Sequence, residues 1–135
     1  MKQALLDLKE FHSVFNCARQ DSPAPISVET FMLRVDLMKE ELNETLDAMR
    51  RYHQTGAMED LIEIADGLAD TCYVVIGTAV AYGIPLDKIW DEVHRSNMAK
   101  APGGVVRYRE DGKVLKPEGW TPPSLRPLLE GKDNQ

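Results

Sequence analysis

Acidic residues at helical spacing are the feature of this sequence that could perform chemistry. Glu40, Glu41 and Glu44 lie close together in one predicted helix, where residues three or four apart share a face. Like charges at this spacing destabilise an isolated helix by roughly 0.2–0.5 kcal/mol per pair, so water or a cation must compensate. Hard divalent cations prefer oxygen ligands, and Mg²⁺ is usually held by carboxylates together with substrate phosphates. The cluster therefore favours a metal site over a solvated acidic face.

A second acidic ladder follows in the next predicted helix. Glu63, Asp66 and Asp70 stay within a stripe of roughly 60°, because successive helical residues rotate by about 100°. Asp66 and Asp70 stand among apolar neighbours, at the start of the most apolar stretch of the chain. A solvated face, which explains most charge runs, suits these two aspartates poorly. Carboxylates from two facing helices thus predict one shared metal site.

The charge of the chain is unevenly distributed. Its formal net charge is −6 and its pI is near 5.0, which argues against a nucleic acid polymer as partner, since that needs a broad basic surface. Residues 100–116 are nevertheless basic, and an anionic small molecule could be bound there and bridged by cations to the acidic helices. The cations of this segment are Lys100, Arg107, Arg109, Lys113 and Lys116.

Four helices are expected to position these residues. Hydrophobic residues recur at helical spacing, and Pro or Gly separates the periodic stretches. The predicted helices cover residues 2–19, 28–54, 58–82 and 86–100, with Ser27 as the N-cap of the second. After residues 101–104 the helical pattern disappears, and Glu110-Asp111-Gly112 between two short apolar runs indicates a hairpin.

Residues 71–81 form the most apolar stretch and are expected to be buried on nearly all sides. A buried strand is the alternative, but the length and the lack of internal turn residues favour a helix. Helices that each bury an apolar stripe must pack as a bundle, and three neighbours cannot cover such a helix completely. The expected fold is an all-α bundle of four to five helices with a short hairpin-like C-terminal extension. We expect homo-oligomerisation, most simply a dimer, to complete it.

Length and composition indicate one soluble domain. With 135 residues, 43% of them hydrophobic and 28% charged, the chain can bury one core. We expect a single domain over residues 1–135, in which 101–135 form a C-terminal flap and tail. We expect no membrane-spanning segment and no signal sequence, and Cys17 and Cys72 suit small core residues in a reducing compartment. The expected location is the cytoplasm.

These motifs together resemble the all-α NTP pyrophosphatases, which include MazG, dimeric dUTPases and phosphoribosyl-ATP pyrophosphohydrolase. The family pattern is E-E-x-x-E on one helix and E-x-x-D on the next, matched here by Glu40, Glu41 and Glu44, then Asp70. The resemblance covers most of the chain, from Phe11 to Trp120. Three segments are most similar to the MazG-like branch with dUTPase-type activity: Asp70-Thr71-Cys72-Tyr73-Val74, His94-Arg95-Ser96-Asn97-Met98-Ala99-Lys100 and Lys116-Pro117-Glu118-Gly119-Trp120.

One position departs from the family pattern. If Asp70 is the aspartate of E-x-x-D, the glutamate position is Gly67, which has no side chain. Asp66, or Glu63 one turn earlier, could replace it on the same face. In the other register Glu63 and Asp66 are themselves the motif, although the apolar run after Asp70 favours the first register.

The resemblance implies an Mg²⁺-dependent enzyme that hydrolyses a nucleoside triphosphate to a monophosphate and pyrophosphate, in dUTP removal or house-cleaning. Mn²⁺ is the expected substitute ion. The implied catalytic residues are Glu40, Glu41, Glu44 and Asp70, and the implied metal ligands are Glu41, Glu44, Asp66 and Asp70. In this mechanism a metal-activated water, oriented by Glu40, attacks a phosphorus in line and displaces pyrophosphate.

The resemblance also points to phosphate contacts from Asn97, Lys100 and Lys116. From the residues alone, Lys100 could merely favour the C-terminal dipole of its helix, and Lys116 could be an ordinary loop lysine. The Gly103-Gly104 connection would let the flap that carries Lys116 move.

Candidates for a base pocket lie in the first predicted helix. Aromatic faces and an amide suit a nucleobase, although helical spacing makes the two phenylalanines core residues first. The candidates are Phe11, His12, Phe15 and Asn16.

Three alternatives remain open. Phosphoribosyl-ATP is the competing substrate within the same class. A di-iron carboxylate bundle would need two E-x-x-H motifs, and only Asp91-Glu92-Val93-His94 comes near one. A non-catalytic helical metal-binding or interaction module is the third. The sequence does not determine the base, the sugar or the number of metal ions.

Overall fold

The computed structural model describes residues 1–131 and is helical throughout its regular structure. No strand is assigned within those residues, so the all-α prediction is confirmed. The elements are α1 (Lys2–Val14), α2 (Val28–Thr55), α3 (Met58–Tyr82), α4 (Leu86–Met98), the 3₁₀ turn η1 (Pro102–Gly104) and α5 (Arg126–Leu129).

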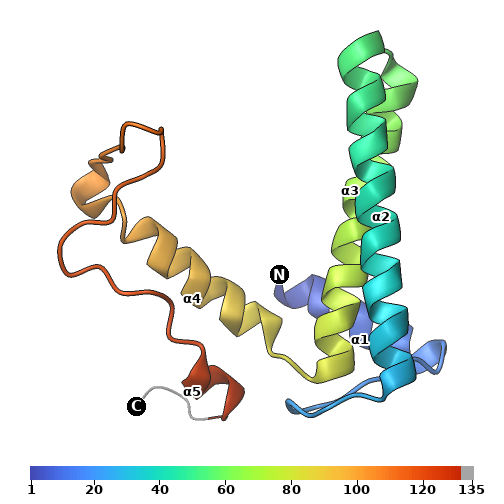
Figure 1. Cartoon of the computed structure of the whole chain (residues 1–135). Helices are drawn as coiled ribbons and strands as arrows, with labels where there is room; N and C mark the ends of the chain where they lie inside the picture. Colours follow the sequence, from blue (N-terminus) through green and yellow to red (C-terminus); the bar gives the residue numbers. More distant parts are fainter. Residues whose placement is uncertain (132–135) are drawn as a thin grey trace. The chain divides into compact units, whose positions relative to one another are not determined.

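The chain forms two compact units, and the first comprises Lys2–Ile84. In it α2 and α3 lie side by side as a long helical hairpin, and α1 packs against α3 at the end away from the α2–α3 connection (Figure 1). The buried apolar residues are contributed by all three helices: Leu5, Leu8, Ala48, Ile76, Ala79, Val80 and Ala81. This packing gives the two acidic helices their mutual placement.

The hairpin begins and ends where the sequence indicates. The Ser27 side chain accepts a hydrogen bond from the Thr30 N–H at 3.1 Å, which caps the first turn of α2 as predicted. Gly56 ends α2 with φ 61° and Gly83 ends α3 with φ 68°, the left-handed conformation that glycine adopts without a Cβ penalty.

The first helix is shorter than the predicted 2–19. α1 ends at Val14, and Asn16 takes a left-handed conformation with φ 52°. The Cys17 N–H then donates to the His12 carbonyl at 2.8 Å, which closes the helix C-terminus. Asparagine tolerates this conformation better than most residues, so Asn16 stops the helix before the Pro-containing segment does.

A buried polar contact joins the three helices of this unit. The His12 side chain is 2% exposed, and its Nδ1 lies 2.6 Å from the Ala18 carbonyl. Arg34, also buried, donates to the Val74 carbonyl at 2.9 Å and to Thr78 Oγ1 at 3.2 Å. A Cβ at Gly77 would lie 2.9 Å from His12 Nε2 and 3.0 Å from an Arg34 nitrogen. Glycine is therefore required where these two side chains meet α3.

The second unit starts at Pro85 and contains α4, a hairpin turn and a tail that returns to α4. The hairpin predicted around residues 110–112 is present as a single antiparallel bridge between Tyr108 and Val114. The tail is held to α4 because Trp120 Nε1 donates to the Ser96 carbonyl at 2.8 Å and Ser96 Oγ donates to the Thr121 carbonyl at 3.2 Å. The expectation of one domain over 1–135 stays a prediction, and its last residues, 132–135, lie outside the described part of the chain.

Two expectations about burial are wrong within this chain. Tyr73 and Val75, in the stretch predicted to be covered on nearly all sides, are 41% and 42% exposed. Cys17 and Cys72 are exposed free thiols and not core residues. Tyr73, Val75 and Cys72 are exposed because only the side of α3 that faces α1 and α2 is covered, whereas Cys17 lies in the segment that follows α1.

The expectation that no segment spans a membrane stays a prediction. α3 is long and apolar enough to cross a bilayer, judged by length and composition alone. One such helix is weak evidence, since the core helix of a soluble protein passes the same test.

Candidate active site

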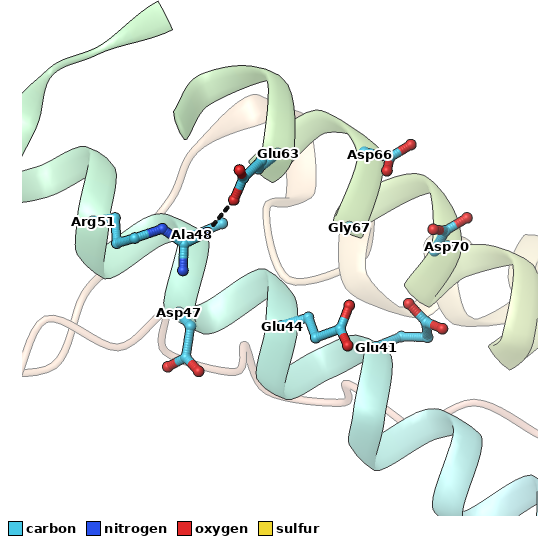
Figure 2. Close-up of a pocket in the computed structure, with 9 residues that line it drawn as sticks. All are labelled: Glu41, Glu44, Asp47, Ala48, Arg51, Glu63, Asp66, Gly67 and Asp70. Carbon is cyan, nitrogen blue, oxygen red and sulfur yellow. Dashed lines mark hydrogen bonds and ion pairs between the residues drawn. The ribbon is translucent and has the colours of Figure 1, made fainter. Parts of the chain in front are cut away.

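The carboxylates of the two acidic helices line one pocket of about 340 Å³ in the first unit (Figure 2). In Figure 2, Glu41 and Glu44 extend from α2, and Asp66 and Asp70 stand on the facing helix α3. The pocket brings together the four predicted metal ligands. Its lining residues are Glu41, Glu44, Asp47, Ala48, Arg51, Glu63, Asp66, Gly67 and Asp70.

Burial and neighbouring negative charges both oppose the ionisation of Glu41. Partial burial raises the pKa of Glu41, and the negative charges of Asp70, Glu44, Glu40 and Asp66 raise it further, in that order. Each neighbour makes the ionised form of Glu41 less favourable. The site is therefore suited to a cation that would neutralise several carboxylates at once.

Two acidic residues of the pocket are already neutralised by arginines. Arg51 forms ion pairs with Glu63 and, at 3.4 Å, with Asp60, and the dashed line in Figure 2 marks the contact with Glu63. Asp47 pairs with Arg50 at 2.6 Å and points away from α3. The acidic residues of the pocket thus fall into two groups, those that pair with an arginine and those that do not.

The unpaired carboxylates are the four predicted metal ligands. Within residues 1–131, none of Glu41, Glu44, Asp66 and Asp70 has a lysine or arginine partner. Hence Asp66, and not Glu63, is the unpaired acidic side chain one turn before Asp70.

The Gly67 position has a packing reason for its missing side chain. A Cβ there would lie 2.5 Å from Thr45 Oγ1 and 3.2 Å from the Thr45 Cα. Thr45 is buried on α2, and its hydroxyl donates to the Glu41 carbonyl at 2.8 Å and lies 3.2 Å from Thr71 Oγ1. Residue 67 therefore faces the contact between the helices, where a glutamate would not fit without separating them.

The donor set suits a hard divalent cation, although its side chains are not gathered around one point. In the described residues 1–131, no three His, Cys, Asp or Glu side chains converge closely enough to hold one ion. Asp66 and Asp70 are exposed, so their side chains can turn toward the pocket at low cost. Carboxylate oxygens without histidine or cysteine are the donors that Mg²⁺ prefers.

The remaining catalytic candidate, Glu40, is exposed on α2 and does not line the pocket. Its charge still acts on Glu41 beside it. The role of holding water stays a prediction.

The predicted phosphate-binding residues all lie in the second unit. Lys100 Nζ donates to Asn97 Oδ1 at 2.8 Å. Lys100 and Lys116 both lie near the Trp120 ring, with their Nζ atoms 5.5 Å and 4.5 Å from its centroid. The structure thus brings the two lysines together, and their contact with phosphate stays a prediction.

The predicted base-binding residues occupy the C-terminal end of α1 and differ in accessibility. Phe11 stacks on Phe15 with ring centroids 4.3 Å apart and meets Tyr73 edge to face at 5.3 Å. Phe15 is 64% exposed, whereas His12 is buried with Nδ1 on the Ala18 carbonyl. The buried His12 side chain is not accessible to a ligand in this structure. The base-binding role of the four residues stays a prediction.

Comparison with known proteins identifies the family. The sequence profile described as phosphoribosyl-ATP pyrophosphohydrolase matches residues 8–97. The chain belongs to this family. The matched range contains both acidic helices and α4 up to Asn97, and the family is part of the all-α NTP pyrophosphatases, as the resemblance indicated. The family is described by its pyrophosphohydrolase activity, and its superfamily typically uses divalent metals.

A curated relative adds no assigned activity. An uncharacterised protein of Acanthamoeba polyphaga mimivirus is 41% identical over 59 residues, which are 44% of this chain and 21% of that protein. The chain therefore spans about a fifth of the length of this relative.

Sequence reasoning missed two features of the pocket. Arg51 was not singled out, although it follows Glu44 by seven positions and so shares its helix face. Thr45 carried no chemical signal, and its contact with Gly67 depends on which parts of the two helices face each other.

Proposed function

We propose that this protein is an Mg²⁺-dependent hydrolase that converts a nucleoside triphosphate to a nucleoside monophosphate and pyrophosphate. One observation carries the proposal: four carboxylates without a cationic partner in residues 1–131 line a single pocket between α2 and α3. Such a pocket gathers negative charge that only cations can offset, and the substrate is itself a polyanion. A substrate bridged through divalent ions accounts for both facts.

The proposed ligands are Glu41, Glu44 and Asp70, with Asp66 in place of the family glutamate. The contact of Gly67 with Thr45 and the ion pair of Glu63 with Arg51 support this choice. When bound, Mg²⁺ neutralises phosphate charge and acts as a Lewis acid, and Mn²⁺ is the expected substitute.

Glu40 has a separate role in the proposed reaction. It neighbours Glu41 but stands outside the pocket lining, where it would orient the attacking water and accept its proton. Attack in line on the α-phosphorus breaks the bond to the bridging oxygen, and pyrophosphate leaves with that oxygen.

Two substrates compete within this chemistry. Phosphoribosyl-ATP is favoured by the description of the matching family, and dUTP or another nucleotide removed in house-cleaning is favoured by the resemblance to the MazG-like branch. Both reactions hydrolyse an anhydride next to the α-phosphorus, so the carboxylate pocket serves either one.

The test is a panel of substrates with purified protein. Pyrophosphate release is measured with Mg²⁺ for dUTP, the other dNTPs, the NTPs and phosphoribosyl-ATP, and each reaction is repeated with EDTA. We expect release from at least one substrate and none with EDTA. Absence of release from every substrate would contradict the proposal.

We further propose that the enzyme works in the cytoplasm as a homo-oligomer, most simply a dimer. Support comes from apolar side chains that stay at least 39% exposed on the α2–α3 hairpin, more than scattered surface residues require. They are Phe31, Met32, Leu33, Leu42, Met49, Leu61, Ile62, Leu68, Tyr73 and Val75, in addition to Val28 and Met58 at the N-terminal ends of the two helices.

A further inference from the structure

The second unit contains a cavity that the carboxylate site does not use. It has a volume of about 560 Å³ and is lined by Lys100, two residues after α4, and by residues of the segment 101–119, here termed the flap loop. Cationic side chains outnumber acidic ones in its lining by three to one. The lining residues are Lys100, Pro102, Val105, Arg107, Leu115, Lys116, Pro117 and Glu118.

The three cations of this cavity lack carboxylate partners within residues 1–131. No ion pair joins Lys100, Arg107 or Lys116 to an Asp or Glu. Arg109, two positions after Arg107, pairs with Asp111 at 2.7 Å and does not line the cavity. The flap loop thus neutralises the arginine outside the cavity and leaves the one inside it available.

The hairpin places Arg107 across from Leu115, the residue before Lys116. The Leu115 N–H donates to the Arg107 carbonyl at 2.7 Å, and the Arg109 N–H donates to the Lys113 carbonyl at 2.7 Å. Arg107 therefore stands across the hairpin from Leu115, the neighbour of Lys116. Arg107 and Arg109 differ in their place along the hairpin, because Arg109 stands across from Lys113, closer to the turn, where it pairs with Asp111.

Trp120 gathers the two lysines at the same place. Lys116 Nζ lies 4.5 Å and Lys100 Nζ lies 5.5 Å from the centre of its ring, within the range of cation–π attraction. The ring itself is held because its Nε1 donates to the Ser96 carbonyl. Asn97 Oδ1 accepts from Lys100 at 2.8 Å and orients that ammonium group.

We propose that this cavity binds a condensed phosphate without needing a metal ion, and that Arg107 is its third cationic ligand. The inference rests on the proposed function for the source of that phosphate, which is the triphosphate of the substrate or released pyrophosphate. Arg107 offers several N–H donors in a planar fork, a geometry suited to two phosphate oxygens at once. The lysines add two further positive charges, and Glu118 leaves the lining with a net positive charge.

Binding of inorganic pyrophosphate and tripolyphosphate to the full-length protein tests the proposal. Titration calorimetry in EDTA, without divalent ions, is performed for the wild type and for Arg107→Gln, Arg107→Lys and Arg109→Gln. Loss of one charged donor should weaken binding by about fivefold to tenfold. We expect this for Arg107→Gln, partial retention for Arg107→Lys, and a change below about twofold for the paired Arg109→Gln.

The outcomes separate a cavity site from diffuse attraction to a basic loop. If Arg107→Gln and Arg109→Gln weakened phosphate binding equally, the inference would be overturned. Binding would then depend only on the net charge of the loop. Failure of wild-type protein to bind either phosphate in EDTA would also overturn it. Circular dichroism of each variant establishes that the fold is retained before binding is compared.

The same measurements distinguish this inference from the proposed function. Asp70→Asn, altered in the other unit, should lose turnover and keep metal-free pyrophosphate binding. In a turnover assay Arg107→Gln should raise KM for the substrate more than it lowers kcat, since it removes binding and not the carboxylate chemistry. The protein could bind pyrophosphate without metal, in a manner that depends on Arg107, and yet hydrolyse no nucleotide. That result would support the phosphate site in the cavity and contradict the proposed function. Turnover with an unchanged KM in Arg107→Gln would reject the cavity.

Discussion

At the scale of single residues, the chemistry of the carboxylate pocket depends on which acids have a cationic partner. Asp70 and Asp47 line the same pocket, but Asp47 pairs with Arg50 at 2.6 Å and Asp70 has no such partner in residues 1–131. The two aspartates therefore form a matched pair for mutation, with the same chemical change in both.

Asp70→Asn should lower pyrophosphohydrolase activity by roughly a hundredfold or more, since charge stabilisation by metal is worth several kcal/mol. It should also raise the melting temperature of the metal-free protein, because Asp70 is the strongest charged neighbour that opposes ionisation of Glu41. The rise in melting temperature on adding Mg²⁺ should disappear. Asp47→Asn is the control and should stay within about threefold of wild-type activity. Equal losses in both variants would count against the assigned ligands.

Asp66 and Glu63 should respond in opposite ways to the same loss of charge. Asp66→Asn should be strongly impaired in turnover with little loss of stability. Glu63→Gln breaks the ion pair with Arg51 and should lower the melting temperature slightly while activity is retained, since an exposed pair contributes only about 0–1 kcal/mol. Steady-state kinetics and thermal melts of both variants decide the matter. A fully active Asp66→Asn beside an inactive Glu63→Gln would reject Asp66 and leave a metal site with Glu63.

His12 should make stability depend on pH in a defined window. Burial lowers its pKa below 6.5, and nearby Arg34 lowers it further, while the hydrogen bond to the Ala18 carbonyl opposes this. The unfolded chain then binds the proton more tightly than the folded protein, so this stabilisation is complete above pH 6.5 and is lost as the pH falls below it. Melting temperatures between pH 7.5 and 5.5 should fall in the wild type and fall less in His12→Gln. Identical slopes in the two proteins would show that another group titrates.

At the scale of helices, the site depends on how closely α3 approaches α2. The approach is set at Gly67, where Thr45 leaves no space for a Cβ. Thr45 follows Glu44 on α2, and Gly67 stands one turn before Asp70 on α3. The contact of Thr45 with Gly67 therefore sets how far the carboxylates of α2 lie from those of α3.

Gly67→Ala should destabilise the protein even though alanine is the better helix former. Alanine gains roughly 1 kcal/mol in helix propensity, but its Cβ would lie 2.5 Å from Thr45 Oγ1, and overpacking costs about 1–3 kcal/mol. Chemical denaturation should show a net loss, with reduced activity because the helices separate at the site. Ala65→Gly, on the exposed face of α3, calibrates the propensity alone. If Gly67→Ala were more stable than the wild type, the contact between α2 and α3 would accommodate the added Cβ without a packing cost.

At the scale of the whole molecule, the exposed apolar surface of the α2–α3 hairpin argues for a second copy. We expect sedimentation equilibrium at micromolar concentration to give a dimer or larger species. Val75→Asp places a charge in the exposed apolar stretch of α3 and should shift the protein toward monomer. Val28→Asp is the control, because this exposed valine begins α2, where an acidic residue favours the helix dipole. A wild type that sediments as a soluble monomer would contradict the expected assembly.

The sequence by itself determined the features that depend on local spacing. The range 58–82 of α3 and the cap at Ser27 were predictable because hydrophobic period, capping residues and glycines act over a few neighbouring positions. The acidic pattern led to the correct family. Residues three or four apart share a helix face whatever the tertiary packing, so this pattern can be read from the sequence alone.

Only the tertiary structure decided which residues from separate segments meet. It paired Glu63 with Arg51, set Gly67 against Thr45, buried His12, and placed Arg107 in the cavity with Lys116. None of these follows from composition or period, because each depends on the register between two elements. A shift of one residue in either helix or hairpin would exchange one partner for another with an unchanged sequence pattern.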